Sequence, residues 1–581
     1  MADGGWAFAR RGYSGVSLRR AIRYPPSAIR FSLISLHRPY PLGNHCEVNT
    51  RRLIGLIVLA LLASWTGLRG CTREEPAPAP EPVRAREAFH ATKPLHLIVS
   101  SQPDSQGQEA DVAWLERELR YLLKRGRMHV APMYDDGSAP NPADGAPEKP
   151  PTQSSHAATA PRTYALRVEV AADRKHAELQ LIAPDDAVER TRSVEIGASG
   201  RLHMVGAVAQ VLPQFLDASH VSKDWMAFIG TQDEYAFESY ARSASDLFGP
   251  AGHGFTRPTV SRPRARTVER LEALTRAHPR FARAWAALAA GYLSLGGDDL
   301  ASLSELAESS AERALTLDEE VAVAHGALGL VHLRRHDWIA AQGKLESALS
   351  LDANLALALE GLACLYADAG HYRAALPHAR HAVALQPRNA GANECLTYAL
   401  TAAPEQLDLA SNDVVSVTAV ARVRALTAFL AGERSSAERL LRRAVSRAEF
   451  DIWADPVLRA AKNPRLIPEA LKAITRAAND GYIDSSTEIL CGTALKQPEF
   501  VFNRLARLQR ENAHAPLRLL WLRDAAFLRK HERFEETIGK AGLPSFWHGS
   551  GRPDVCAQEP KVYGCNIQEV SSMQSVRSAI E

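Results

Sequence analysis

The sequence has little net charge, few aromatic residues and no long apolar run. Its 581 residues carry a formal charge of +3, which disfavours a strongly basic nucleic-acid binder and an acidic tail. Phe, Trp and Tyr make up only 7% of the chain, and this suits helices packed through alanine better than a β-rich core. A chain of this length is too long for one core, so we expect about two to four domains.

The short motifs of common catalytic and metal sites are also missing. We find no Gly-x-Ser-x-Gly, Walker, Gly-x-Gly-x-x-Gly or His-Glu-x-x-His motif, and no Cys-x-x-Cys pair. Asp298 and Asp299 are the most conspicuous acidic pair, but they belong to a turn. His371, His378 and His381 cluster in one repeat without a carboxylate at ligand spacing. We therefore predict no catalytic residue, no metal and no cofactor.

Residues 1–50 form a basic extension without helical or strand periodicity. Seven arginines face only Asp3 and Glu47 there. One interpretation is a basic arm that contacts nucleic acid or anionic lipid; the interpretation we favour is a disordered extension, or an incorrectly assigned start. Val48 precedes a positively charged and then apolar stretch typical of a secretory signal, so a start at Val48 would explain the extension.

The longest apolar run extends from Leu53 to Leu68, which is short for an untilted span needing about 20 residues. The run ends at Cys71, where Leu68, Arg69 and Gly70 resemble a bacterial lipobox except for the arginine. Residues 51–71 are therefore predicted to be a signal peptide with a lipidated Cys71, or an uncleaved membrane anchor. Flanking charges place the amino end in the cytoplasm and the bulk of the chain in the periplasm. Residues 72–94 then form a Pro/Ala tether.

Residues 95–220 alternate between strand and helix patterns. Leu95–Val99, Met128–Pro132, Thr163–Val170 and Ala177–Ile182 read as strands, and Glu109–Lys124 and Gly206–Leu216 as helices. Residues 135–161 read as a loose loop. This order resembles the small α/β domain of the periplasmic Tol–Pal translocation protein. It also resembles the domain that precedes tetratricopeptide repeats in bacterial membrane regulators and in accessory regions of class III adenylate cyclases.

Residues 233–460 contain a repeat with a period of 34 residues. In the two regular copies, 322–355 and 356–389, Leu328 returns as Leu362, Ala341 as Ala375 and Ala348 as Ala382. A fixed period of this length indicates a helix–turn–helix solenoid, and its small residues resemble the tetratricopeptide repeat. The preceding copy carries a six-residue insertion, which we assign to the turn at residues 296–299. We predict a mainly α fold with a solenoid preceded by a small α/β domain.

Residues 461–565 are expected to form a helical carboxyl-terminal cap, followed by a disordered tail at 566–581. The run from Gly542 through Trp547 to Cys556 resembles the cap that follows repeats of the same regulator-like group. Cys556 pairs with Cys565 in our preferred disulfide, with Cys491 as the alternative, because an oxidising periplasm permits such a staple. We interpret Cys364 and Cys395, inside the repeats, as small apolar packing residues.

The first functional hypothesis is a non-enzymatic, membrane-tethered periplasmic scaffold. Its concave face would bind a protein or peptide partner, with His325, Arg334, Glu360 and Asn393 as the candidate contacts that repeat packing leaves free. The membrane would be reached through Leu53–Leu68 or a lipid on Cys71, and no nucleic acid is expected. The second hypothesis is a sensory protein whose α/β domain binds a ligand that the repeats relay. A hydrolase ranks third, because no nucleophile and base are visible.

Overall fold

The computed structural model describes residues 95–103, 112–125, 128, 130, 163–197, 200–217, 228–250, 252, 254–256, 261–296, 300–402, 418–511 and 515–566. These residues all belong to one compact unit, residues 86–581. The predicted extension, signal or anchor, tether and loose loop, and Cys71 with them, lie outside the described residues, as does the tail after residue 566. Within the described residues, no helix combines the length and the apolar character that a membrane crossing requires.

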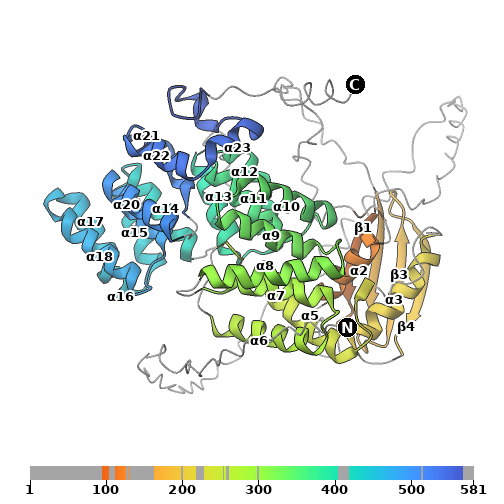
Figure 1. Ribbon diagram of the computed structural model, residues 1–581. Coiled ribbons are helices and arrows are strands. Elements are labelled where there is room, and N and C mark those ends of the chain that lie inside the picture. The colour runs from red at the N-terminus through yellow and green to blue at the C-terminus, as the bar shows by residue number, and fades with distance from the viewer. Residues whose placement is uncertain are drawn as a thin grey trace, which may run out of the picture. The chain divides into compact units, whose positions relative to one another are not determined.

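The small α/β domain is a four-stranded sheet with two helices (Figure 1). β1 (Leu95–Ser101) lies parallel to β2 (Tyr164–Val170). The chain between them contains α2 (Ala113–Arg125) and crosses over, so that β2 starts at the same end of the sheet as β1. β3 (His176–Ile182) and β4 (Val188–Glu195) continue the sheet antiparallel, in the order β1-β2-β3-β4. α3 (Arg201–Phe215) closes the domain.

Three details of this domain differ from the sequence prediction. β4 was not expected, because its sequence is polar and most of its residues are exposed at the edge of the sheet. The strand expected at residues 128–132 is reduced, in its described part, to one bridge between Val130 and Leu95. The helix predicted from Gly206 begins at Arg201, since the apolar positions before Gly206 are buried as well.

The rest of the described chain is helical, which confirms the mainly α prediction. Helices α5 to α13 pair in antiparallel order as in a solenoid. Their bounds are α5 Glu234–Phe248, α6 Arg262–Ala277, α7 Ala282–Ser294, α8 Leu300–Leu317, α9 Ala322–Arg334, α10 Trp338–Leu351, α11 Ala356–Asp368, α12 Tyr372–Leu385 and α13 Ala390–Ala402. The later helices are α14 Thr418–Leu430, α15 Arg434–Ala444, α16 Arg447–Glu449, α17 Asp455–Lys462, α18 Ile467–Asn479, α19 Ser485–Ala494, α20 Pro498–Arg510, α21 Ala526–Arg529, α22 Arg533–Lys540 and α23 Leu543–Ser550.

The helix starts reproduce the period of the sequence. α9, α11 and α13 begin at Ala322, Ala356 and Ala390, which are 34 residues apart, whereas α7 begins at Ala282, 40 residues before α9. From the sequence we assigned all six extra residues to the turn, but the turn contains only two of them. α8 has 18 residues against 14 in α10, which takes up four, and the α7–α8 connection of five residues against three takes up the other two. A lengthened helix keeps its hydrogen bonds, which an enlarged loop would lose.

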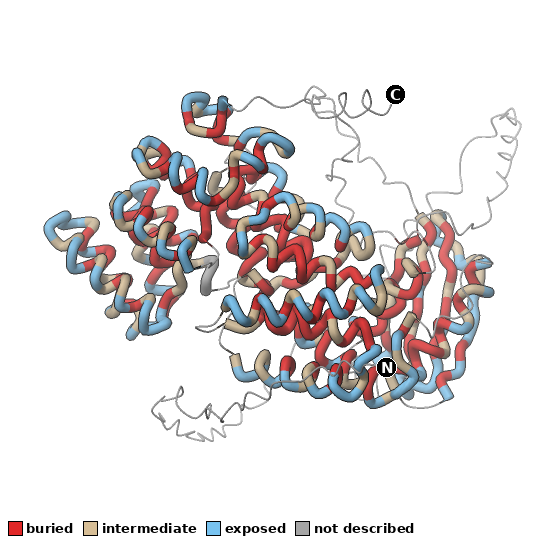
Figure 2. Tube along the Cα trace, viewed as in Figure 1, coloured by how far each residue is buried: buried red, intermediate tan, exposed pale blue. Residues whose placement is uncertain are grey.

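Alanine sets the spacing of the solenoid helices. Ala341, Ala348, Ala375 and Ala382 are all fully buried, at the positions where neighbouring helices touch. Figure 2 shows the buried residues of α7 to α13 facing one another, with exposed residues along the outer faces. A methyl side chain lets two helix backbones approach closely, so enlarging any of these residues would force the helices apart.

The carboxyl-terminal segment, which we define as residues 515–566, does not extend the solenoid. It folds back onto the edge of the regular repeats, where three indole N–H groups meet backbone carbonyls. Trp521 donates to Asp368 O at 2.8 Å, Trp547 to Ala369 O at 2.9 Å and Trp338 to Ala541 O at 2.6 Å. The sequence suggested a cap over the end of the repeats, whereas residues 515–566 pack against the edge of the two regular repeats; we call this contact the clamp.

Candidate functional site

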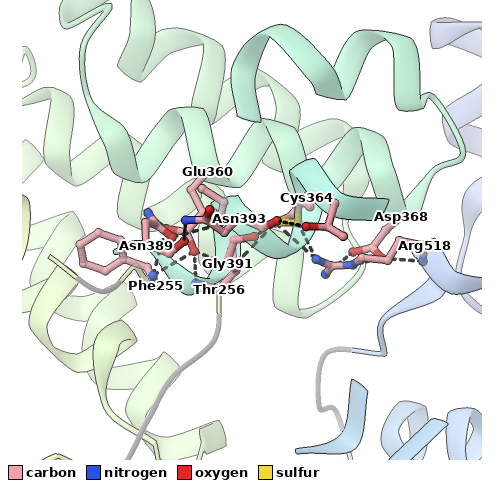
Figure 3. The surroundings of a disulfide bond; sticks show 12 residues. Phe255, Thr256, Glu360, Cys364, Asp368, Asn389, Gly391, Asn393 and Arg518 are labelled. Atoms are coloured by element: carbon pink, nitrogen blue, oxygen red, sulfur yellow. Dashed lines mark hydrogen bonds and ion pairs between the residues drawn. A yellow bond between two sulfur atoms is a disulfide. The ribbon is translucent and has the colours of Figure 1, made fainter. Parts of the chain in front are cut away.

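One stripe of polar and sulfur-containing residues runs along the inner side of α11. Glu360, Cys364 and Asp368 are spaced by four residues, so they lie on one face of the helix (Figure 3). Each of them is fully buried. The surrounding positions of α11 are apolar, and each member of the stripe contacts a segment far away in the sequence. The stripe is therefore where the solenoid receives other parts of the chain.

Glu360 receives the backbone of a short segment before α6. Its carboxylate accepts the Phe255 N–H at 3.0 Å, the Thr256 N–H at 2.6 Å and the Thr256 hydroxyl at 2.5 Å. The Asn389 amide donates to the same carboxylate at 2.8 Å. Four donors converge on one buried side chain, which replaces the water that a carboxylate loses on burial.

Arg334 holds the other side of the same segment. Its guanidinium donates to Phe255 O at 3.3 Å, and also to Leu293 O at 2.6 Å and to Ser304 Oγ at 3.2 Å. Burial lowers the pKa of Arg334 to about 10, although the charge of Glu360 opposes this. Glu360 thus accepts hydrogen bonds from the N–H groups of the segment, and Arg334 donates to one of its carbonyl groups. Phe255, between them in the segment, is 1% exposed.

Two glycines make room for this close contact. Gly254 has a φ of +85°, and a Cβ there would overlap the Asn389 side chain. A Cβ on Gly391, in the first turn of α13, would overlap the Thr256 hydroxyl and a carboxylate oxygen of Glu360. The backbone of the segment, which bends at Phe255 and Thr256, therefore lies directly on the helices.

The middle of the stripe is a disulfide between Cys364 and Cys395, which corrects our interpretation of these two as packing residues. It joins α11 to α13. Both positions lie in first helices of successive repeats, and 31 residues separate them. That separation is the 34-residue period less three, about one helical turn, which places the second cysteine opposite the first. The repeat period therefore already indicated that these two cysteines lie close together on neighbouring helices.

We expect the double substitution Cys364→Ala and Cys395→Ala to lower the free energy of unfolding by about 3–4 kcal/mol, because the cross-link closes a loop of 31 residues in the unfolded chain. The measurement is the urea midpoint of the intact chain, together with non-reducing peptide mapping. The matched control is Cys491→Ala, since Cys491 is the free, buried cysteine of the described residues. Free thiols at both positions in the native protein would contradict the cross-link.

Asp368 ends the stripe in a buried ion pair with Arg518. Its oxygens accept the Arg518 Nε at 2.9 Å and Nη2 at 3.0 Å, and the Arg518 backbone N–H at 2.8 Å. The Asp368 side chain is 0% and that of Arg518 4% exposed. Burial opposes the charge of Arg518, but Asp368, together with Glu394 and Tyr398, outweighs burial and raises the pKa of Arg518 above its ordinary value. This pair fastens the carboxyl-terminal segment to α11.

The residues predicted to be free for a partner have a different role. Glu360 and Asn393 are fully buried, and Arg334 donates to three groups of the chain itself. His325 is partly buried, and its Nε2 lies 2.8 Å from Glu319 O. The prediction took these residues from the first helices of the repeats, but it did not foresee that Phe255 and Thr256 occupy Glu360 and Arg334. Phe255, Thr256, Asn389 and Arg518 were missed because no local pattern marks a loop that fills a groove.

The histidines of this repeat bind separate partners. His371 Nε2 lies 2.9 Å from Gly551 O, His381 Nε2 lies 3.0 Å from Asn354 Oδ1, and His378 stacks on the Tyr366 ring. Among the residues that the structure describes, no group of three or more His, Cys, Asp or Glu is placed to hold a metal ion.

We expect stability to fall as pH drops from about 6.5 towards 4, because burial, with His381 nearby, lowers the pKa of His378 to about 4. The folded state then binds fewer protons than the unfolded state, so His378 contributes stability above its ordinary pKa and loses it on acidification. Between pH 7 and pH 5 the loss is about 1–2 kcal/mol. His378→Gln should flatten this part of the pH profile of the urea midpoint. The exposed His548→Gln should leave it unchanged, and equal slopes in both variants would contradict the assignment.

A second disulfide joins Cys556 and Cys565 near the end of the carboxyl-terminal segment. Nine residues separate them. The alternative partner, Cys491, lies in α19 as a buried free thiol, and burial raises its pKa above the ordinary range. The cross-link lies beside Trp547, whose ring a side chain on Gly564 would overlap, so it holds the last turn against the clamp.

The class that this architecture defines is a mainly helical solenoid of tetratricopeptide-like repeats with a small four-stranded α/β domain. No protein-family model matches the chain, and no curated protein matches its sequence. Among solved structures, the chain is similar to the tetratricopeptide-repeat domain of P58(IPK), with 13% identity over 49% of this chain and 94% of that one, at a TM-score of 0.14. The assignment of the class rests on the helix pairs and their period in this chain. The resemblance to the Tol–Pal and cyclase-associated domains stays a prediction.

Proposed function

We propose that this protein is a peptide-binding scaffold whose concave face holds a short, bent segment of a partner protein. The observation that carries the proposal is that the face already holds such a segment, formed by residues 252 and 254–256 of the chain itself. Glu360 and Arg334 bind its backbone from opposite sides, as described above. A groove that binds backbone groups accepts many sequences, and apolar sockets then supply selectivity.

The seat defines the kind of segment that fits. A glycine is needed before the aromatic residue, because Gly254 has a positive φ and lies on Asn389. An aromatic ring follows in the socket of Phe255, beside the ring of Phe248 at 5.9 Å. A hydroxyl residue comes next, since Thr256 donates to Glu360. The partner is therefore expected to present a Gly-aromatic-Thr or Gly-aromatic-Ser run in the bent conformation of residues 254–256, in competition with the chain's own segment.

The test uses a fluorescent peptide with the sequence of residues 252–258, Gly-His-Gly-Phe-Thr-Arg-Pro, and the full chain. Phe255→Ala with Thr256→Ala weakens the internal segment but leaves the groove intact, so this variant should bind the peptide in a saturable manner. The unmodified chain should bind the peptide at least about tenfold more weakly, because its own segment fills the groove. Fluorescence anisotropy measures both.

Two further substitutions locate the binding. Adding Glu360→Gln removes the carboxylate, and adding Gly391→Ala fills the space of the threonine hydroxyl; each should abolish peptide binding. Gly343→Ala is the matched control, because Gly343 lies on the exposed face of α10 with open space around it. A folded Phe255→Ala/Thr256→Ala variant that binds no peptide, or that binds it equally well after Gly391→Ala, would refute the proposal.

We also propose that the scaffold works at the outer side of a bacterial membrane, held by residues 53–68 or by a lipid on Cys71. Two disulfides within the described residues support this, because such bonds persist in oxidising compartments and are rare in the cytosol. The test is the mass of the mature amino terminus from the native membrane fraction. A diacylglyceryl Cys71 or an intact span would fit, and a reduced protein in the cytosolic fraction would not.

A further inference from the structure

A cavity of about 500 Å³ lies between the α/β domain and the solenoid. It is separate from the groove that holds residues 254–256. One side is α2, and the other consists of the starts of α7, α9 and α11 with the ends of α5, α10 and α12. Its size falls in the range of pockets for small ligands, about 300–1,000 Å³. Since two domains meet here, a ligand in the cavity would contact both of them.

The walls of the cavity are mostly apolar. Trp114, Phe248, Leu351, Leu355 and Leu385 contribute aromatic and aliphatic surface from four different helices and one turn. Binding becomes more favourable when an apolar chain replaces water on this surface, by about 25 cal/mol for each Å² removed from water. The walls therefore select a ligand with an elongated apolar part.

The cavity also contains cationic groups with unused donors. Arg283 is held between the rings of Tyr121 and Tyr240, at 4.3 Å and 4.7 Å from their centroids. Its Nη2 donates to Glu118 at 2.6 Å, but its Nη1 is buried without a hydrogen-bond partner. The Arg283 side chain is 7% exposed. A buried guanidinium N–H without an acceptor costs free energy that a bound acceptor would recover.

The charges around Arg283 leave one positive charge in surplus. Arg117 also relies on Glu118, at 3.7 Å, so two guanidinium groups share one carboxylate. The remaining ionic groups of the lining balance in number: Arg120 pairs with Glu116 at 2.9 Å, and Lys124 is matched by Asp352, which acts against the lowering of the Lys124 pKa by burial. Arg117 Nη2 and the Tyr121 hydroxyl are buried and unpartnered as well. The amino ends of α9 and α11 add partial positive charge at the same cavity.

We infer that this cavity binds a carboxylate at the end of an apolar chain, such as a fatty carboxylate or the free carboxyl end of an apolar peptide. The carboxylate accepts hydrogen bonds from Arg283, Arg117 and Tyr121, and the apolar part lies against the walls. Burial raises the pKa of Tyr121 to about 12, so its hydroxyl stays a donor at neutral pH. Because α2 and the starts of three solenoid helices line one cavity, the ligand would stabilise the contact between the two domains.

The test titrates the full chain by calorimetry with decanoate and, as a counterpart of opposite charge, decyltrimethylammonium. A second pair of probes is acetyl-Ala-Ala-Leu as free acid and as amide. Saturable binding of decanoate or of the acid peptide, with binding of the cation and the amide at least about tenfold weaker, supports the inference. Which of the two carboxylates binds more tightly tells the fatty source from the peptide source.

Variants place the binding in the cavity. Arg117→Gln removes the surplus charge and leaves the Arg283–Glu118 pair, so it should weaken carboxylate binding about tenfold. Leu351→Trp should abolish binding, because the larger side chain would fill part of the cavity. Arg192→Gln, on the exposed face of β4, is the matched control and should change nothing. The inference is overturned if no carboxylate binds, if the cation binds equally well, or if a folded Leu351→Trp variant keeps full affinity.

Discussion

Arg518→Ala is expected to lower the free energy of unfolding by about 3–5 kcal/mol, which is the cost of leaving one member of a buried ion pair without its partner. Asp368 would lose two guanidinium donors and would remain at 0% exposure inside the repeats. The penalty comes from the stranded carboxylate more than from the lost attraction. It should therefore exceed the effect of any surface ion pair in the chain.

The same substitution should also release the carboxyl-terminal segment. Arg518 lies in the first turn of that segment, and Trp521 and Trp547 hold its later parts through single hydrogen bonds to α11 and the residue after it. Limited proteolysis should therefore cut within residues 515–566 faster in the variant, at a urea concentration where the repeats remain folded. The measurements are the urea midpoint at constant slope and the protease fragment masses.

Two comparisons separate the ion pair from general damage. Arg523→Ala removes an arginine of the same segment whose side chain is 69% exposed, and it should change stability by less than about 0.5 kcal/mol. Asp368→Leu with Arg518→Met removes both charges together and should cost clearly less than Arg518→Ala alone. If the double variant were the less stable one, the stranded charge would not be the source of the loss.

The regular part of the fold could be predicted because its cause is local and repeated. Ala341 and Ala375 recur at a fixed interval, and the period alone places the starts of α9, α11 and α13. The insertion was seen in the sequence but wrongly assigned to the turn. Helix length responds to packing against neighbours, which a count of residues between motifs does not contain.

The candidate site could be predicted only in part, because its essential contacts are between distant segments. The first-helix positions of Glu360 and Asn393 were identified from the repeat, yet whether such residues face solvent depends on what lies over them. Phe255 reaches Glu360 across 105 residues, and Arg518 reaches Asp368 across 150. One local signal was available: a carboxylate in the otherwise apolar first helix α11 has to be paired if it is buried.

Glu360→Ala is expected to cost at least about 3 kcal/mol, because three kinds of donor lose their acceptor at once and each unsatisfied buried group costs about 1–3 kcal/mol. The donors are the Phe255 and Thr256 N–H groups, the threonine hydroxyl and the Asn389 amide. Glu360→Gln should be little better, since its amide nitrogen would bring two more donors to a site that needs acceptors.

Hydrogen exchange distinguishes this local loss from a general one. The amides of Phe255 and Thr256 should exchange much faster in Glu360→Ala, while those of α14 and α15 keep their protection. Glu312→Ala, on an exposed position of α8, is the control and should stay within about 0.5 kcal/mol of the parent. Unchanged exchange at residues 255 and 256 would mean that Glu360 does not hold the segment.

A double-mutant cycle with Thr256→Val then assigns the contribution of one contact. If Glu360 stabilises the chain through the threonine hydroxyl, the two substitutions together cost less than the sum of the single costs, because the second removes a partner that the first has already left unsatisfied. Full additivity would mean that Glu360 acts through the backbone N–H groups and the Asn389 amide, without the hydroxyl. The groove would then accept any residue after the aromatic one, and the preference for Thr or Ser in a partner peptide would disappear.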